Sequence, residues 1–267
     1  MSRDRELASG KLLLDEPGAG VSRLRILNRE RRGALDQEIL DALAETVVSL
    51  DARCLVLTGS GPVFSAGYDL ANLGEGELDK RAEQLVAHPF HAAIEAIEAF
   101  PFPVIAQLNG HAIGGGLELA LSCDIRMAAR GIRMGMPPAK LGLVYSHTGL
   151  RRFLDLCGPG YTAELFHVGS NVDAARALEI GLVNHVVEPG QLEARTTLMA
   201  GAIAANAPLS LKGNKRVIRT LQAHAAGLPP DVERELVELR ESCFRTGDFR
   251  EGVRAFHEKR PPEWKGR

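Results

Sequence analysis

The sequence has little cysteine, and its few cysteines are not arranged to bind metal or to form disulfides. They number four among 267 residues and are far apart, at Cys54, Cys123, Cys157 and Cys243. No two form a CxxC pair and no histidine accompanies them at ligand spacing, which argues against a structural zinc. We therefore expect free thiols, no metal and a reducing, cytoplasmic location.

Excess positive charge and long apolar stretches are also missing. The formal net charge is -2 at pH 7 and the sequence pI is about 6.5, whereas a nucleic-acid-binding surface needs clustered excess lysine and arginine. No apolar run approaches the roughly eighteen residues of a membrane span. The N-terminal segment MSRDRELASGK lacks the apolar core of a secretory signal. We therefore expect neither nucleic acid nor membrane as a partner.

What the sequence does contain is an alternation of strand-like and helix-like segments. Residues 11–14 and 22–27 predict a hairpin, and Asp36 is placed to be the N-cap of the helix that follows. The later predicted elements are, in order, a strand over 54–57, a helix over 80–100, a strand over 104–108, a helix over 114–121, and strands over 125–128 and 182–187. Such alternation implies a largely parallel sheet with helices packed outside it.

Two glycine-containing segments, 64–70 and 109–120, each follow a predicted strand and lead towards a helix. Backbone N–H groups at such junctions can point at a ligand. Gly114, Gly115 and Gly116 remove every Cβ from the approach path, so a ligand oxygen can come close to the main chain. The run has neither the Gly-Lys-Ser/Thr of a P-loop nor the GxGxxG spacing of a dinucleotide site. Taken alone, it is also compatible with a tight turn that binds nothing.

Together the two loops resemble those of the crotonase (enoyl-CoA hydratase/isomerase) superfamily, and the resemblance covers nearly the whole chain. It includes a basic segment over 28–35 and a C-terminal stretch over 248–260. The resemblance implies an α/β crotonase-like fold of repeated ββα units with a parallel sheet core. It further implies an acyl-CoA-binding catalytic core over 1–200, and a helical region over 201–267 for trimerisation and completion of the CoA site. Trimers of this family often pair into hexamers.

The resemblance also implies roles for particular residues. The backbone N–H groups of Tyr68 and Gly115 match the oxyanion hole, whose preorganised donors typically supply roughly 10²–10³ in rate each. The Tyr68 side chain either lines the acyl pocket or only packs beside it. The other positions that the resemblance assigns to substrate or CoA binding are Arg32, Ala66, Asp69, Leu70, Gly114, Pro138, Leu141, Phe256 and Lys259. Coenzyme A enters as part of the substrate, and no separate cofactor is implied.

The reaction depends on three further positions. Glu118 matches the first of the two catalytic glutamates of enoyl-CoA hydratases, although a carboxylate at a helix start is also favoured by the helix dipole. The second glutamate falls at Pro138, which has no titratable group. With Tyr145 seven residues later, the pattern resembles the subgroup that decarboxylates methylmalonyl-CoA. Tyr145 would donate a proton or hold the substrate carboxylate, or else form only a wall of the pocket.

Our first hypothesis is therefore decarboxylation of a short, branched malonyl-type CoA thioester. A hydratase or isomerase with reassigned acid and base residues is the second, and other acyl-thioester chemistry, including chemistry on a carrier protein, stays open. A non-catalytic acyl-CoA-binding protein on the same fold is a further alternative. Decarboxylation raises one difficulty: an ionised Glu118 near a substrate carboxylate would repel it, so Glu118 must be protonated, turned away or paired.

Overall fold

The computed structural model describes residues 4–69, 86–224, 230–263 and 265. Its strands are β1 Arg5–Leu7, β2 Leu12–Gly18, β3 Val21–Ile26, β4 Cys54–Thr58, β5 Val63–Ser65, β6 Val104–Leu108, β7 His111–Ile113, β8 Ile125–Ala129, β9 Arg133–Gly135, β10 Val172–Asp173 and β11 His185–Val187. Its helices are α1 Gln37–Ser49, α3 His91–Ala99, α4 Gly115–Ser122, α5 His147–Ala163, α6 Ala174–Glu179, α7 Leu192–Ala204, α8 Pro208–His224, α9 Pro230–Phe244 and α10 Gly247–Glu258. Shorter helical turns are η1 Ala8–Gly10, η3 Val86–Phe90, η4 Pro138–Leu141, η5 Glu164–Val168 and η6 Pro189–Gln191.

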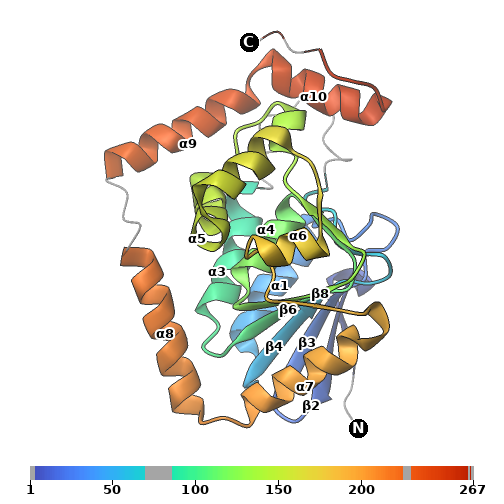
Figure 1. Ribbon diagram of the computed structural model, residues 1–267, viewed down its shortest axis with the longest axis vertical. Helices are drawn as coiled ribbons and strands as arrows, with labels where there is room; N and C mark the ends of the chain where they lie inside the picture. Colours follow the sequence, from blue (N-terminus) through green and yellow to red (C-terminus); the bar gives the residue numbers. More distant parts are fainter. Residues whose placement is uncertain (1–3, 70–85, 225–229, 264, 266–267) are drawn as a thin grey trace.

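A seven-stranded sheet in the order β1-β2-β3-β4-β6-β8-β11 lies at the centre of the fold (Figure 1). Its first three strands pair antiparallel, and every pairing from β3 to β11 is parallel. A smaller sheet has the order β10-β9-β7-β5. Three times in succession, a long strand of the first sheet is followed by a short strand of the second and then by a helix. This repeat is the predicted ββα unit, and the predicted α/β fold class is confirmed.

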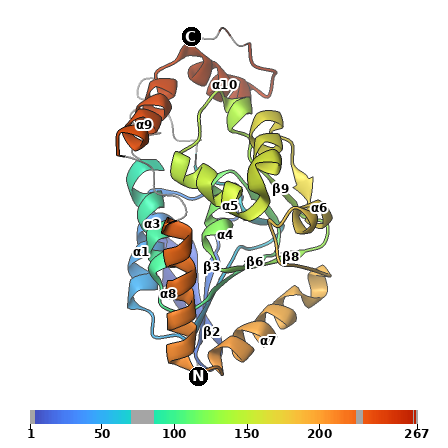
Figure 2. The ribbon, with the colours of Figure 1, turned by 60° about the vertical axis from the view of Figure 1, so that its left-hand side comes forward.

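Helices cover both faces of the main sheet, as the parallel pairing requires. Helix α7 packs on β4, β6 and β8 from one side, and α1, α3 and α4 lie on the other side (Figure 2). Helix α1 begins where the sequence places its cap, because the side chain of Asp36 accepts a hydrogen bond from the backbone N–H of Ile39 at 3.0 Å.

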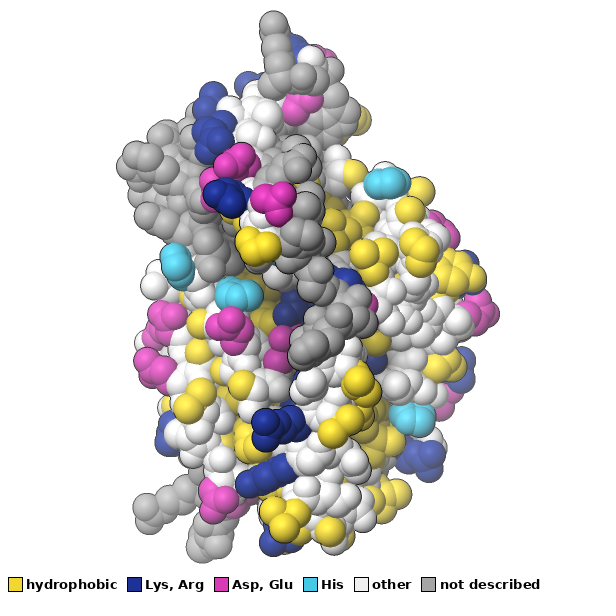
Figure 3. Space-filling model, turned by 90° about the vertical axis from the view of Figure 1, so that its left-hand side faces the viewer, with side chains coloured by type: hydrophobic (Ala, Val, Ile, Leu, Met, Phe, Trp, Pro, Cys, Tyr) yellow, Lys and Arg dark blue, Asp and Glu magenta, His cyan; other side chains and the backbone are white. Residues whose placement is uncertain are grey.

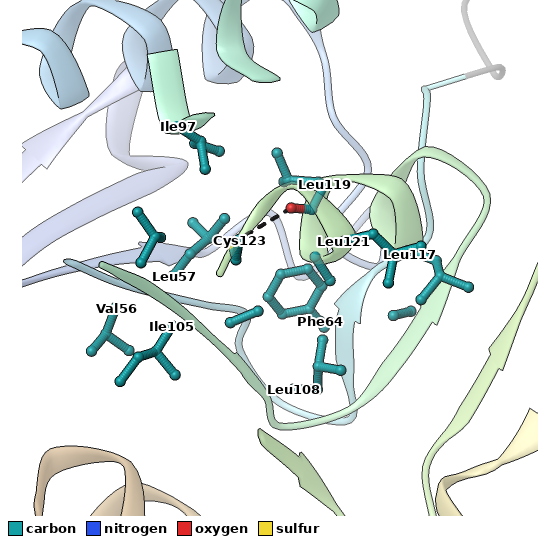
Figure 4. Close-up of a cluster of buried hydrophobic side chains, with 14 of the residues drawn as sticks. Val56, Leu57, Phe64, Ile97, Ile105, Leu108, Leu117, Leu119, Leu121 and Cys123 are labelled. Atoms are coloured by element: carbon teal, nitrogen blue, oxygen red, sulfur yellow. Dashed lines mark hydrogen bonds between the residues drawn. The ribbon is translucent and has the colours of Figure 1, made fainter. Parts of the chain in front are cut away.

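The hydrophobic core surrounds α4, which is buried at every one of its positions (Figure 4). Leu117, Leu119 and Leu121 of this helix pack among side chains such as Phe64 and Leu108 from the neighbouring strands. Full burial of each such side chain contributes about 1.5–3 kcal/mol. A helix enclosed on all sides holds its residues rigidly, and one of these residues carries a charge, Glu118.

Some elements differ from their predicted bounds. The helix expected over 80–100 is described from residue 86, first as η3 and then as α3; residues 80–85 lie outside the described part. The last strand of the main sheet begins at His185 rather than 182, because Leu182 and Val183 donate to the carbonyl of Ala177 and so close the end of α6. The strands of the smaller sheet were not predicted, since two or three residues are too few to show a period.

Helix α8 is joined to the body, since Lys215 forms a salt bridge with Asp124 at 2.8 Å, whereas α9 lies away from the sheet (Figure 1). The predicted boundary between residues 200 and 201 lies within α7. Helix α10 returns to the body and packs on η4, where a Cβ on Gly252 would lie 2.3 Å from the carbonyl oxygen of Leu141. Figure 3 shows the face that includes α8, where apolar side chains, among them Val217, Ile218 and Leu221, are exposed beside basic ones. Within the described ranges, no helix is both long and apolar enough to cross a membrane.

Candidate active site

Two loops that are distant in the sequence touch each other through glycines. Gly67 has φ +89°, and a Cβ there would lie 2.8 Å from the carbonyl oxygen of Ile113 and 2.9 Å from the amide nitrogen of Gly115. At Gly116 a Cβ would lie 2.4 Å from the carbonyl oxygen of Ser65. Any larger residue at Gly67 or Gly116 would therefore push the two loops apart.

The loop that carries Gly67 is fixed from its other side by the basic segment before α1. The Ser65 hydroxyl donates to the carbonyl of Gly33 at 2.7 Å, and the N–H of Ala66 donates to the carbonyl of Arg32 at 3.0 Å. Only the main chain of Arg32 takes part in these bonds, and its side chain remains exposed. The segment thus sets the shape of the loop and places a cation beside it.

The predicted oxyanion-hole positions lie in these contacting loops. Gly115 is the first residue of α4, where an N–H has no acceptor within the helix and the helix dipole favours negative charge. Gly114, with φ 56° and ψ -127°, turns the chain into the helix and donates its own N–H to the carbonyl of Gly135 at 2.9 Å. Tyr68 directly follows Gly67, whose backbone abuts the Gly115 amide. The fold therefore brings the main chain of Tyr68 and Gly115 close together.

Glu118 lies one helical turn after Gly115, and it is only 3% exposed. Both carboxylate oxygens have partners: the Tyr145 hydroxyl donates to Oε2 at 2.5 Å, and Arg152 Nη1 donates to Oε1 at 3.1 Å. Burial raises the pKa of Glu118, and the raised pKa is opposed by the charge of Arg152 and by the hydrogen bond from Tyr145. Two donors on one carboxyl group match the ionised form, which accepts at both oxygens.

Arg152 holds the carboxylate from α5 and is itself held. Its Nε donates to Glu98 Oε1 at 2.9 Å, and its Nη1 also donates to the carbonyl of Thr148 at 3.1 Å. Sequence reasoning missed Arg152, because its partner Glu98 is 54 positions away and its partner Glu118 is 34 positions away. One arginine thus links two carboxylates, of which one lies beside the candidate oxyanion hole.

The two tyrosines form an aromatic wall over this group. A Cβ on Gly115 would lie 3.1 Å from Cζ of Tyr68, so the ring of the half-buried Tyr68 lies against the helix start. Tyr68 packs edge-on against Phe90 at 4.9 Å, and Tyr145 packs edge-on against Phe166 at 5.5 Å between ring centroids. Burial, the charge of Glu118 and the proximity of Tyr68 raise the pKa of Tyr145 well above its ordinary value. Tyr145 therefore keeps its proton at neutral pH.

Gly149 makes room for the Glu118–Tyr145 pair, and sequence reasoning missed it as well. A Cβ at this position of α5 would lie 2.5 Å from Tyr145 Cε1 and 2.9 Å from Glu118 Oε1. The N–H of Gly149 donates to the side chain of Ser146, which caps the helix. A lone glycine near a helix start gives no sequence signal for such a role.

The remaining predicted binding residues are spread around this group. Asp69 is buried and accepts from Arg31 Nη1 with both oxygens, at 2.8 and 3.1 Å. Leu70 lies outside the described residues. Pro138 is buried in η4, with Leu141 at the end of the same turn under α10.

The two predicted CoA-binding residues of α10 lie at its C-terminal end. Phe256 is 62% exposed, and Lys259 is the C-cap residue, also exposed. In this chain, α10 packs on the η4 turn of its own body.

Comparison with known proteins identifies the family. The family model for enoyl-CoA hydratase/isomerase matches residues 16–267. The short-chain-enoyl-CoA hydratase of Clostridium acetobutylicum is 34% identical over 248 residues, which cover 91% of each chain. The methylmalonyl-CoA decarboxylase of Escherichia coli K12 is 32% identical over 239 residues, 87% of this chain and 90% of that protein.

A solved structure of methylmalonyl-CoA decarboxylase complexed with 2S-carboxypropyl-CoA superimposes with a TM-score of 0.88. It is 29% identical and covers 96% of this chain and 98% of its own. The sheet repeat, the paired glycine loops and these comparisons agree on one class of protein, that of the acyl-CoA enzymes. The chain belongs to the crotonase superfamily, the enoyl-CoA hydratase/isomerase family.

Proposed function

We propose that this enzyme decarboxylates a short malonyl-type CoA thioester such as methylmalonyl-CoA. One observation carries the proposal: Glu118 is bound at both oxygens by Tyr145 and Arg152, while the position of the second hydratase glutamate is the buried Pro138. A hydratase must activate water and move an α-proton, which ordinarily takes two acid-base groups. A decarboxylase needs no base to remove a carbon-bound proton.

The proposed reaction begins with the thioester carbonyl oxygen accepting hydrogen bonds from the N–H groups of Tyr68 and Gly115. The bond between the α-carbon and the carboxylate breaks, CO2 leaves, and the electron pair forms the enolate, whose oxygen anion the two amides and the start of α4 stabilise. A proton then adds to the α-carbon and gives the saturated acyl-CoA. The Tyr145 hydroxyl, which its raised pKa keeps protonated, or a water molecule supplies this proton.

Binding of the CoA portion is proposed from the family pattern. Arg32 would face the CoA phosphates from the basic segment, and Phe256 and Lys259 would complete the CoA site, in a trimer or in a hexamer of two trimers. The Tyr68 ring, which lies on Gly115, would form a wall of the acyl pocket. An acyl pocket bounded by the Tyr68 and Tyr145 rings would favour a short acyl group.

The relatives support this proposal, although they include both a decarboxylase and a hydratase. The solved decarboxylase is complexed with 2S-carboxypropyl-CoA, a CoA derivative that carries a carboxyl group, and that structure superimposes closely on this chain. The hydratase of Clostridium acetobutylicum is about as similar in sequence as the decarboxylase of Escherichia coli. Hydration of an enoyl-CoA is therefore the second candidate, with Glu118 as its acid-base group.

One experiment separates the candidates. The purified protein is incubated with methylmalonyl-CoA, ethylmalonyl-CoA and crotonyl-CoA, and the masses of the products are measured by mass spectrometry. Loss of the mass of CO2 from either malonyl thioester is the expected result. Gain of the mass of water by crotonyl-CoA at ordinary enzymatic rates would refute the argument from Pro138. No change in any substrate would instead indicate a protein that only binds acyl-CoA.

A further inference from the structure

Arg152 lies between two carboxylates, those of Glu118 and Glu98. It contacts Glu118 at 3.1 Å and Glu98 at 2.9 Å, and the side chain of Arg152 is only 15% exposed. The contact with Glu118 does not resemble a surface ion pair, because Glu118 is almost completely buried. A buried carboxylate without a cation would be costly or would take up a proton.

The negative charge of Glu118 bears directly on binding of the proposed substrate, which carries a carboxylate of its own. The thioester carbonyl would lie at the N–H of Gly115, and Glu118 is three residues further on the same helix. Residues three apart lie on one helix face at about 5–6 Å, so the α-carbon and its carboxylate would come near Glu118. Two like charges about 6 Å apart at an effective dielectric of about 20 repel enough to weaken binding roughly 100-fold. The site must therefore contain a group that offsets Glu118.

We propose that Arg152 is the positioning residue that neutralises Glu118, and thereby lets the site accept an acyl group that carries its own carboxylate. This inference rests on the proposed function and adds a charge requirement to it. The geometry supports it twice. Arg152 binds the oxygen of Glu118 that Tyr145 leaves free, and Glu98 together with the carbonyl of Thr148 prevents the guanidinium from turning away.

Among the residues that the structure describes, four groups act on the charge of Glu118. Arg152 from α5 and Tyr145 from the segment before α5 favour the ionised form, as does His91 of α3 when it is protonated, whereas Glu98 of α3 opposes it. Without Arg152, burial raises the pKa of Glu118 further. The site then repels an anionic acyl group only at a pH above that raised pKa, so binding of such a ligand should become dependent on pH.

The test compares two unreactive ligands that differ by one carboxylate, carboxypropyl-CoA and propyl-CoA. Dissociation constants are measured by calorimetry from about pH 6 to about pH 9 for the wild type and for Arg152→Gln. We expect Arg152→Gln to weaken carboxypropyl-CoA binding about 10- to 100-fold, increasingly at higher pH. Binding of propyl-CoA should change less than about threefold. Equal loss for both ligands, or no loss for either, would overturn the proposal.

Other variants act as controls. Arg151→Gln removes the same charge one residue away, from a partly exposed side chain that pairs with Asp155, and should bind both ligands normally. Arg152→Lys should recover most of the affinity for carboxypropyl-CoA. In the double variant Arg152→Gln with Glu118→Gln, the repelling charge is gone, so carboxypropyl-CoA binding should recover and lose its dependence on pH.

A further variant covers the case in which Arg152→Gln does not fold. Glu98→Gln removes a negative charge but keeps a side-chain oxygen that can accept from Arg152 Nε. Arg152 should therefore stay in contact with Glu118, and carboxypropyl-CoA binding should strengthen selectively. Weaker binding of both ligands by this variant would show that the Arg152 contacts are only structural. Because neither ligand reacts, these results stand apart from the proposed function. A wild type that releases no CO2 from malonyl thioesters would refute that function while leaving the charge-selective binding intact.

Discussion

Gly149→Ala should inactivate the enzyme while leaving it folded. The added Cβ would lie 2.5 Å from Tyr145 Cε1 and 2.9 Å from Glu118 Oε1, whereas carbon atoms pack favourably at about 3.5–4.0 Å. The Tyr145 ring must therefore move by about 1 Å, which disrupts its 2.5 Å hydrogen bond to Glu118. Misplacement on this scale costs about 100-fold in rate when the group takes part in the reaction.

The effect of Gly149→Ala on stability should be small by comparison. Overpacking costs about 1–3 kcal/mol, and alanine in place of glycine within a helix returns about 0.5–1 kcal/mol. The net loss in unfolding free energy is then about 0–2.5 kcal/mol, measured by urea unfolding. The assay is the initial rate of CO2 release from methylmalonyl-CoA.

A matched control lies on the same helix. Gly160 has open space where its Cβ would be, so Gly160→Ala should keep the wild-type rate and should not lower stability. The reasoning is refuted if Gly149→Ala retains the wild-type rate. It is also refuted if the variant loses activity only because it is unfolded under assay conditions.

Three further predictions follow from the site. Gly115→Pro removes one proposed oxyanion donor at a helix position that tolerates proline. It should slow decarboxylation at least about 100-fold more than Gly115→Ala, which keeps the N–H. Equal rates for the two variants would argue against that donor. Pro138→Glu supplies the missing carboxylate and should raise the rate of crotonyl-CoA hydration at least about tenfold. The rate is followed as loss of enoyl absorbance. An unchanged rate would mean that the second carboxylate is not what limits hydration. Because folding raises the pKa of Glu118, its contribution to stability is fully present below the unfolded pKa and is lost as pH rises through the folded pKa. The unfolding free energy of the wild type minus that of Glu118→Gln should therefore fall as the pH rises above about 4.5, the ordinary pKa of a glutamate, and a rising difference would contradict the direction of the shift.

Much of the fold is readable from the sequence because its signals are local. Asp36 caps α1 through a residue three positions away, and the alternation of strands and helices repeats at a spacing that hydrophobic periodicity reveals. The glycine run also marks the start of α4 correctly. The short strands of the second sheet escape such reasoning, because their pairing partners lie in other repeats and each strand is only two or three residues long.

The candidate site divides in the same way. Gly115 and Glu118 are close in sequence, and their proximity follows from one helical turn. Their partners are not readable, because Arg152 is joined to Glu98 only after α3 and α5 have packed around α4. The role of Gly149 is likewise invisible, since it depends on a side-chain contact that a missing Cβ permits. Local patterns locate the glycines and Glu118, whereas tertiary packing brings the partners of Glu118 to it.

The central claim is that the main-chain N–H groups of Tyr68 and Gly115 polarise a thioester carbonyl. Infrared difference spectroscopy of bound propionyl-CoA, isotope-labelled at that carbonyl, measures this polarisation directly. The account predicts that the carbonyl stretch moves to lower frequency on binding to the wild type, and that most of this shift is lost in Gly115→Pro but kept in Gly115→Ala. A carbonyl frequency in the bound state equal to that in water would contradict it.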